Sequence, residues 1–334
     1  MGQEPFLLRS DNGIQKISWL DKETFERLAG HHDAPCVSIY IPTHDAGTEV
    51  NEQADKLTFK SMLQKVQQSL TRERFNPSIA GQLLIPGLQL LNDDDFWRNQ
   101  SPGLAVFLSP GYGACCQLPT SPEEKLNINT SFQLTPLASM LTDTDYAWLL
   151  VLSKHATRAY RADRFTLVRI DIPELPNGNA PLLLAGPDDL ISVYRSISSY
   201  PHIAKESLTG NFDHIDDASL YRLVRPLLDT HFDIERQETM ARQLDHSSRV
   251  NSFPQDVIRA AFEGRIAELY VMKGTELWGH YEPSVSEPVL HEHEETGDEN
   301  LADQAVIQTV LHGGKAHLVE NMPIAAKLAA VMRY

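Results

Sequence analysis

The first third of the chain alternates between two hydrophobic periods, one typical of strands and one typical of helices. Residues 36–44, CVSIYIPTH, form a short β-branched and aromatic run that stops at Pro42, which predicts a strand. Residues 52–70 predict a helix, because their hydrophobic positions are spaced four, three and four: Phe59, Leu63, Val66 and Leu70. A second apolar run, GLAVFLSP at residues 103–110, predicts another buried strand. The order strand, helix, strand indicates a mixed α/β or α+β domain over residues 1–133.

The middle of the chain, residues 134–248, opens with three apolar runs that are separated by very short connections. They are AWLLVLS, ATRAYRA and TLVRIDI, and each predicts a strand. Short connections permit only antiparallel pairing, so the three strands should form a meander. The run PLLLAG follows, and then come a short helix and a long one that Asp216 or Asp217 begins.

The last stretch, residues 249–334, has the pattern of a compact α/β domain. A short helix ends at Gly264, and the runs IAELYVM and ELWGHY predict two strands after it. Between residues 283 and 300 the composition becomes polar and acidic, which predicts an exposed loop. Asp298 is then expected to cap a helix that Gly313 and Gly314 end, and two final strands, KAHLVE and AAVMRY, complete the domain.

Composition and charge narrow the functional classes. The chain has 334 residues and a formal net charge of −16, so it lacks the basic field that extensive phosphate contacts require, and we expect no DNA partner. Three cysteines, two of them adjacent, cannot supply a disulfide framework and favour a reducing compartment. No signal peptide and no membrane-length apolar run is recognisable, so we expect a soluble, cytoplasmic protein. The oligomeric state is not predicted.

His291 and His293 are the most conspicuous candidates for a metal site. Alternate histidines on a strand share one face and can share a metal ion. The surrounding acidic segment offers no third ligand at a fixed spacing, however, so the pattern favours a solvated loop. The scattered His31, His32 and His44 form no catalytic constellation. The sequence therefore predicts no metal site.

No motif requires catalysis or a cofactor. Cys115 and Cys116 have neither a base nor an electropositive setting in the sequence, which favours buried structural thiols. The glycines at 313 and 314 follow a helix and suit a C-cap rather than a phosphate-binding loop. We therefore predict no catalytic residue, no cofactor and no enzymatic activity. The alternative is a metal-dependent nuclease or hydrolase that uses aspartates of the middle domain: Asp143, Asp145 and Asp171.

Several segments, in the right order along the chain, together resemble the bacterial archaeo-eukaryotic release factor family. They are CVSIYIPTH, LTFKSMLQKVQQSL, FWRNQSPGLAVFLSPG, LLLAGPDDLISVYRSISSYPHI, AAFEGRIAELYVMKGTELWG and GDENLADQAVIQTVLHGGKAHLV. The resemblance implies three domains like those of the eukaryotic class-one release factor and Pelota. The central one would be a ribonuclease-H-like sheet, and the C-terminal one a small α/β sandwich of the kink-turn-binding ribosomal protein type.

The resemblance also implies a role directed at the ribosome or a translation factor, in hibernation or rescue. The Gly-Gly-Gln tripeptide of true release factors occurs nowhere in the sequence, and the Asn-Ile-Lys-Ser tetrapeptide of stop-codon reading is missing too. Peptidyl-tRNA hydrolysis is therefore not implied. The expected partner-binding loop precedes the helix at 52–70 and includes Thr43, His44, Asp45, Glu49 and Asn51. A stress or defence adaptor that retains the fold is a further alternative.

The central domain departs from the family near residues 173–180. Only PELPNGNA separates the third meander strand from PLLLAG, whereas a ribonuclease-H-like sheet places a crossover helix there. We expect that eight residues form a loop but not this crossover. The sequence leaves open whether a segment has been deleted between Ile172 and Pro181 or is missing from the chain as given.

Overall fold

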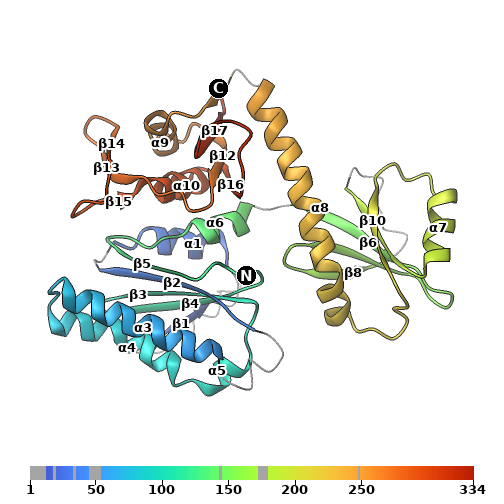
Figure 1. The fold of residues 1–334 in the computed structure, drawn as a ribbon, viewed down its shortest axis with the longest axis horizontal. Coiled ribbons are helices and arrows are strands. Elements are labelled where there is room, and N and C mark those ends of the chain that lie inside the picture. The colour runs from blue at the N-terminus through green and yellow to red at the C-terminus, as the bar shows by residue number, and fades with distance from the viewer. Residues whose placement is uncertain are drawn as a thin grey trace, which may run out of the picture. The chain divides into compact units, whose positions relative to one another are not determined.

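A computed structural model describes residues 13–17, 20–32, 35–44, 54–142, 145–171, 180–246 and 249–334. The fold is mixed α/β, as the sequence predicts, with several sheets and helices (Figure 1). Contacts divide the chain into two units, Met1–Asp143 with His246–Tyr334, and Thr144–Asp245. Residues 134–142, which the sequence assigns to the start of a central domain, lie in the first unit. The division into three domains stays a prediction.

The first unit contains a five-stranded sheet with the order β1-β4-β3-β2-β5. β1 pairs with β4 in parallel, and the other neighbours are antiparallel. The predicted strands at 36–44 and 103–110 are the two central ones. The strands are β1 (Gln15–Ile17), β2 (Cys36–Pro42), β3 (Gly103–Ser109), β4 (Tyr112–Leu118) and β5 (Lys125–Asn129).

Helices cover both faces of this sheet (Figure 1). The predicted helix is α3 (Ala54–Arg72), and its hydrophobic stripe packs on one face together with α4 (Pro77–Leu91) and α5 (Asp94–Arg98). The opposite face carries α1 (Lys22–Ala29) and α6 (Thr135–Thr142), with Phe107 and Phe132 buried between them and the sheet.

The C-terminal part of the first unit has two further sheets. One has the order β11-β17-β12-β16 and the other β14-β13-β15. The strands are β11 (Val250–Asn251), β12 (Ile266–Met272), β13 (Trp278–Glu282), β14 (Glu287–His291), β15 (Glu299–Asn300), β16 (Lys315–Val319) and β17 (Leu328–Met332), and the helices are α9 (Pro254–Phe262) and α10 (Leu301–Leu311). Residues of these elements belong to the same hydrophobic core as Phe107 and Phe132, so the N-terminal and C-terminal segments bury one another.

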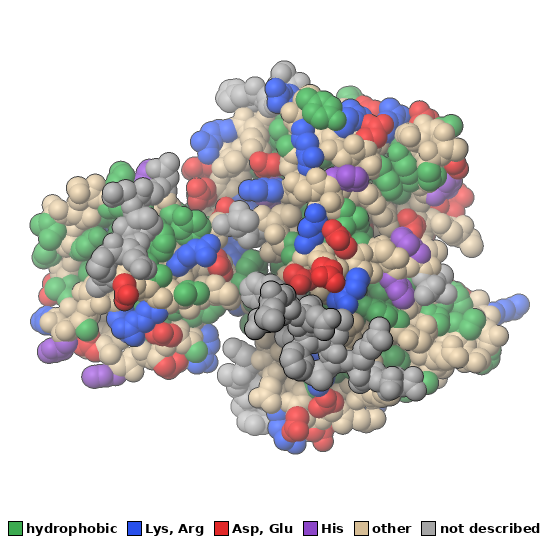
Figure 2. All heavy atoms as spheres, turned by 180° about the vertical axis from the view of Figure 1, so that it is seen from behind, with side chains coloured by type: hydrophobic (Ala, Val, Ile, Leu, Met, Phe, Trp, Pro, Cys, Tyr) green, Lys and Arg blue, Asp and Glu red, His purple; other side chains and the backbone are tan. Residues whose placement is uncertain are grey.

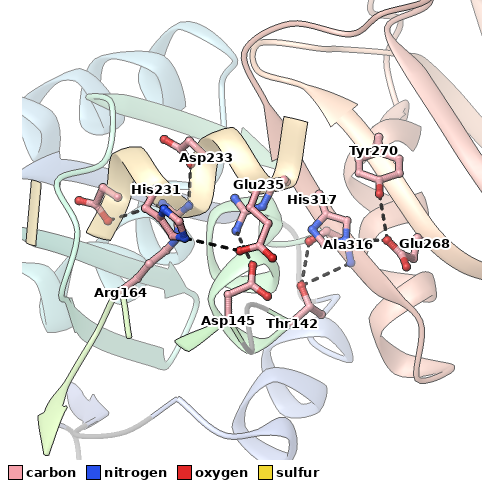
Figure 3. Close-up of polar contacts among 12 residues, drawn as sticks. Thr142, Asp145, Arg164, His231, Asp233, Glu235, Glu268, Tyr270, Ala316 and His317 are labelled. Carbon is pink, nitrogen blue, oxygen red and sulfur yellow. Dashed lines mark hydrogen bonds and ion pairs between the residues drawn. The ribbon is translucent and has the colours of Figure 1, made fainter. Parts of the chain in front are cut away.

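Polar contacts also join the two segments of the first unit. The Asp303 carboxylate on α10 is buried and accepts hydrogen bonds from the backbone N–H groups of Leu134 and Thr135 and from the Thr135 hydroxyl. It thereby satisfies donors at the start of α6 that would otherwise lack partners. Burial raises the pKa of Asp303 to about 6, against the lowering effect of these hydrogen bonds. At the other end of α6, the Thr142 hydroxyl donates to the Ala316 carbonyl at 2.8 Å (Figure 3).

The second unit is built on a five-stranded sheet with the order β10-β9-β6-β7-β8. The predicted meander is confirmed, because β6 (Tyr146–Val151), β7 (Arg158–Asp163) and β8 (Leu167–Ile170) pair antiparallel in sequence. β9 (Leu182–Gly186) and β10 (Ile203–Thr209) extend the sheet on the other side of β6, in parallel. β10 is a strand that the sequence pattern does not predict.

Two helices cover the two faces of the second sheet. α8 (Asp217–His246) packs its hydrophobic stripe on one face, and α7 (Asp188–Ile197) packs on the other. α8 begins where the sequence predicts, because the Asp216 side chain accepts a hydrogen bond from the Ser219 N–H at 2.8 Å.

The parallel pairing of β6 and β9 bears on the short connection after β8. Residues 172–179 lie outside the described part of the chain, yet β9 pairs with β6 in regular parallel register. The expectation that these residues form a loop and not a crossover helix lies outside the described residues and stays a prediction, but the parallel strand that normally follows such a crossover is present. To pass from the end of β8 to the start of β9, the chain must cross three strand spacings and return along the length of one strand. The straight distance between these two points is about 22 Å. The eleven residues 171–181 can span roughly 36 Å, so a crossover helix is not required.

The acidic segment at 283–300 is not a simple loop, which corrects the sequence prediction. β14 and β15 both lie within it and pair with β13 on its two sides. β14 is an edge strand, where Pro288 and the exposed Glu287 are compatible with pairing on one side, and composition alone therefore gave the wrong prediction. Within the described residues, no helix is long and apolar enough to cross a membrane.

Candidate functional site

The predicted partner-binding loop leaves the first sheet at the end of β2. Thr43 is 5% exposed; its N–H donates to the Pro102 carbonyl at 3.0 Å and its hydroxyl to the Ser101 carbonyl at 2.6 Å. These two bonds hold the chain against the start of β3. Asp45, Glu49 and Asn51 lie outside the described residues, so their predicted role stays a prediction.

His44 and Asp55 bring the two ends of this loop together. The Asp55 carboxylate lies in the first turn of α3 and is 6% exposed. It accepts the His44 N–H at 2.8 Å with one oxygen, and the other lies 2.7 Å from His44 Nδ1. A carboxylate in the first turn also suits the positive end of a helix. Asp55 therefore fixes both the backbone and the ring of His44.

This geometry determines what the His44 ring can offer to a partner. An ionised carboxylate only accepts, so Nδ1 carries a hydrogen and Nε2 remains for other contacts. The His44 side chain is 46% exposed, so the ring is accessible from solvent. The Thr43 hydroxyl is already donated to a carbonyl, and no nucleophile contacts the ring among the interactions of the described residues. The pair suits polar recognition rather than covalent catalysis.

Lys56, the first cation of α3 in the sequence, is paired with a carboxylate. Lys56 Nζ lies 2.7 Å from a carboxylate oxygen of Asp94 on α5. The hydrogen bond from Lys56 lowers the pKa of Asp94, so the carboxylate remains charged and paired. Lys56 therefore adds little free positive charge beside His44.

The cysteines behave as structural residues, as the sequence predicts. Cys36, Cys115 and Cys116 are buried and free of disulfides. Burial raises the pKa of Cys115 to about 12 and that of Cys116 to about 11. Neither thiol is ionised near neutral pH, so neither is an activated nucleophile.

The N-terminal histidines are not catalytic groups either. The His31 ring stacks with both Tyr112 and Phe132, at centroid distances of 4.6 Å and 5.0 Å, and its Nε2 lies 2.5 Å from the buried Ser109 hydroxyl. That hydroxyl is fully buried, so a substrate cannot reach it. His32 is exposed beside it.

The C-terminal histidines are arranged differently from the sequence prediction. His291 ends β14, and the structure brings it together with His280 and Asp298, while His293 lies outside the group. One ligand atom from each of the three residues lies within 4.8 Å of the others. Asp298 was expected to cap α10, but Asn300 caps it, accepting from the Ala302 N–H at 3.1 Å.

Electrostatics reinforce the contact between His291 and Asp298. The Asp298 oxygens lie 2.9 Å and 3.0 Å from His291 Nδ1. This hydrogen bond raises the pKa of His291. Burial acts to raise the pKa of Asp298, but the bonds from His291 and from the Glu295 N–H outweigh it, so that pKa is lowered. Sequence periodicity could not reveal this group, because its members come from three separate strands or turns.

The aspartates of the middle unit do not converge on a metal-binding geometry within the described residues. Asp145 lies 3.9 Å from Arg236 on α8, and Asp143 is outside the described residues. On the same helix Asp233 pairs with Arg164 at 2.6 Å (Figure 3). The Arg164 side chain is 12% exposed, so its charge serves the internal packing of this unit.

The remaining sequence candidates are structural. Gly313 has a φ of +75° and directly follows the C-cap of α10, and the Gly314 N–H donates to the Thr309 carbonyl at 2.7 Å. The glycine pair therefore ends a helix, as predicted.

On the face shown in Figure 2, Lys and Arg side chains are interspersed with Asp and Glu. This mixture gives no extended basic field on that face.

Comparisons with known proteins bear on the family resemblance. A model of the bacterial archaeo-eukaryotic release factor family 3 matches residues 175–265. The resemblance to this family is confirmed there. The matched range contains β9, α7, β10 and α8 of the second unit, and β11 and α9 at the start of the C-terminal part.

Solved structures give weaker similarities. Pelota from Archaeoglobus fulgidus is 15% identical with a TM-score of 0.37, covering 69% of this chain and 79% of its own. The archaeal translation termination factor aRF1 is 12% identical with a TM-score of 0.25, covering 96% and 99%. Pelota from Thermoplasma acidophilum is 11% identical with a TM-score of 0.24, covering 70% and 80%. TM-scores below 0.5 do not establish a shared fold. A search of curated proteins finds no match.

Proposed function

We propose that this chain is a release-factor-like protein that binds the ribosome or a translation factor and acts in hibernation or rescue. The observation that carries the proposal is the family match over residues 175–265. The order β10-β9-β6-β7-β8, with a three-strand meander continued by two parallel strands, is compatible with a ribonuclease-H-like middle domain. The α/β segment after residue 249 would be the kink-turn-binding type of module.

The proposed action is binding without peptidyl-tRNA hydrolysis. Placing a water on the peptidyl ester is the task of a Gly-Gly-Gln tripeptide in true release factors, and the sequence has none. The two adjacent thiols cannot replace it, because their raised pKa values keep them protonated. No bound cofactor is needed for a protein that occupies a site rather than transforms a substrate.

The proposed contact surface is the loop that leaves at Thr43 and returns at Asp55. Hydrogen bonds on both sides of the loop fix the flanking residues Thr43, His44 and Asp55, so the two ends from which the loop projects are held in place. The exposed His44 ring can form a hydrogen bond through Nε2 with a polar group of an RNA or protein partner beside the loop. The middle unit would supply the second contact.

Co-sedimentation with ribosomes tests the proposal. The full chain is expected to pellet with vacant ribosomes at low salt and to be released as salt rises, since polar contacts are screened. Asp55→Ala should weaken pelleting about tenfold, because it frees both His44 and the loop end. Asp95→Ala is the matched control: it removes an exposed carboxylate of α5 that pairs with Arg98 rather than with Lys56, and it should leave pelleting unchanged.

Two results would overturn the proposal in different ways. A chain that stays in the supernatant at low salt with both vacant and translating ribosomes does not act on the ribosome. Release of a labelled peptide from peptidyl-tRNA above the uncatalysed rate would refute binding without hydrolysis, while leaving ribosome binding intact.

A further inference from the structure

One face of the small sheet β14-β13-β15 gathers two imidazoles and a buried carboxylate. His291 on β14 lies directly opposite Trp278 on β13, and His280 lies two residues further along β13, so both histidines point to the same face. Trp278 and Gly279 pair with Asn300 and Glu299 of β15. Continuing this register by one residue places Asp298 opposite His280. Strand pairing therefore brings the three side chains together from separate parts of the sequence.

The distances and burial are those of a built cluster. The rings of His280 and His291 have centroids 5.9 Å apart, and one potential ligand atom from each residue of the cluster lies within 4.8 Å of the other two. Asp298 is 4% exposed and is held by the Glu295 N–H at 2.9 Å, while His280 is exposed. The cluster thus has a fixed inner side and an outer side open to solvent.

The surrounding charge favours a cation. Residues 287–300 contain no Lys or Arg and six carboxylates, which are Glu287, Glu292, Glu294, Glu295, Asp298 and Glu299. Such a concentration of one sign raises the local concentration of counter-ions. The Glu295 carboxylate lies 3.9 Å from His291 Nδ1, near enough to the cluster to contribute a further oxygen.

We propose that His280, His291 and Asp298 bind a divalent transition-metal cation, with Zn²⁺ as the favoured ion. Two imidazole nitrogens and one carboxylate oxygen are ligands typical of Zn²⁺ sites that keep one position open. Metal–ligand bonds near 2.1 Å place the ligands about 3.4 Å apart in a tetrahedron. The contact of 2.9 Å between His291 and Asp298 must open slightly, and His280, whose ligand atom lies within 4.8 Å of the other two, must approach by at most about 1.4 Å.

Bound metal would connect all three strands of the small sheet at one point. β15 has only two residues, so its pairing with β13 is short. The Asp298 end of the cluster directly precedes β15 and the cap of α10. The site is separate from the proposed ribosome contact, and neither depends on the other.

Zn²⁺ titration of the metal-stripped full chain, followed by calorimetry, tests this site. We expect one high-affinity ion per chain. His280→Ala and Asp298→Asn should each weaken binding at least about 100-fold, because even residues that only orient a ligand contribute 10–100-fold. His293→Ala is the matched control, since His293 is an exposed histidine of the same acidic segment outside the cluster, and it should change the affinity less than twofold.

Co²⁺ provides a readout that does not depend on stability. Bound in a tetrahedral site it should give visible absorption, which His280→Ala should abolish while the far-ultraviolet circular dichroism remains that of the wild type. Equal weakening by His293→Ala and His280→Ala would indicate unspecific binding by an acidic segment and refute the site. Absence of stoichiometric Zn²⁺ and Co²⁺ binding to the folded wild type would also refute it.

Discussion

The free energy of unfolding of the Asp303→Ala variant is expected to be about 3 kcal/mol lower than that of the Asp303→Asn variant. The reason lies in the contact between α10 and the start of α6. Asp303 Oδ1 accepts from Leu134 N–H at 3.1 Å, from Thr135 N–H at 2.8 Å and from the Thr135 hydroxyl. Asparagine retains an oxygen at this position, whereas alanine leaves three donors in a buried site without an acceptor. Both variants are neutral, so the comparison isolates the hydrogen bonds from the charge.

Urea unfolding of the two variants, combined with hydrogen exchange, measures this effect. The amides of Leu134 and Thr135 should lose protection in Asp303→Ala and keep it in Asp303→Asn. Equal stability and equal protection in the two variants would mean that the start of α6 does not depend on α10.

The wild-type carboxyl adds a pH dependence to the same contact. Its pKa in the folded chain is raised from 3.8 to about 6, so folding favours the protonated form. The stability that this group contributes is therefore full below pH 3.8 and is lost as pH rises to 6. Relative to Asp303→Asn, the wild type should lose roughly 2.5 kcal/mol between pH 4 and 7, since each pKa unit corresponds to about 1.4 kcal/mol. If the free energies of unfolding of the wild type and of Asp303→Asn changed with pH in parallel, the raised pKa of Asp303 would be contradicted.

Local patterns predicted the elements whose burial follows one period. The stripe of α3, the alternation of β2 and the meander of the middle unit are found where the sequence places them, because each buries a face that its own residues define. α4 was missed, because Pro86, Gly81 and Gly87 argue against a helix. Tertiary packing overrides that preference: a Cβ on Gly113 of β4 would approach Pro86 Cβ to 2.3 Å, so the strand and the helix lie in close contact.

For the candidate sites too, local sequence patterns predicted single residues but not the partners that tertiary structure brings to them. Thr43 and His44 could be identified from the end of a strand, but Asp55, the buried partner of His44, belongs to the next helix. His291 was recognised as a possible ligand, and the adjacent His293 was the natural companion in sequence. The actual neighbours, His280 and Asp298, come together through strand register and a turn. Neither hydrophobic period nor composition carries that information.

Gly279 provides the strongest test of that register. It lies in β13 opposite Leu290 with a φ of +153°, and a Cβ built there would come within 1.9 Å of the Val289 backbone oxygen. Backbone atoms cannot move aside as a flexible side chain can, so Gly279→Ala must separate β13 from β14. We expect a loss of about 4 kcal/mol, the sum of backbone strain and steric overlap.

The matched control is Gly274→Ala. Gly274 also has a positive φ, +72°, but a Cβ there meets nothing within 4 Å, so only backbone strain of about 1 kcal/mol is expected. Hydrogen exchange should show that Gly279→Ala exposes the amides of β14 and that Gly274→Ala does not. Because His280 and His291 lie on the two strands that separate, Gly279→Ala should also abolish stoichiometric Zn²⁺ binding without removing a ligand. Retained protection of β14 in Gly279→Ala would show that the register of this sheet differs from the one that places the two histidines on one face.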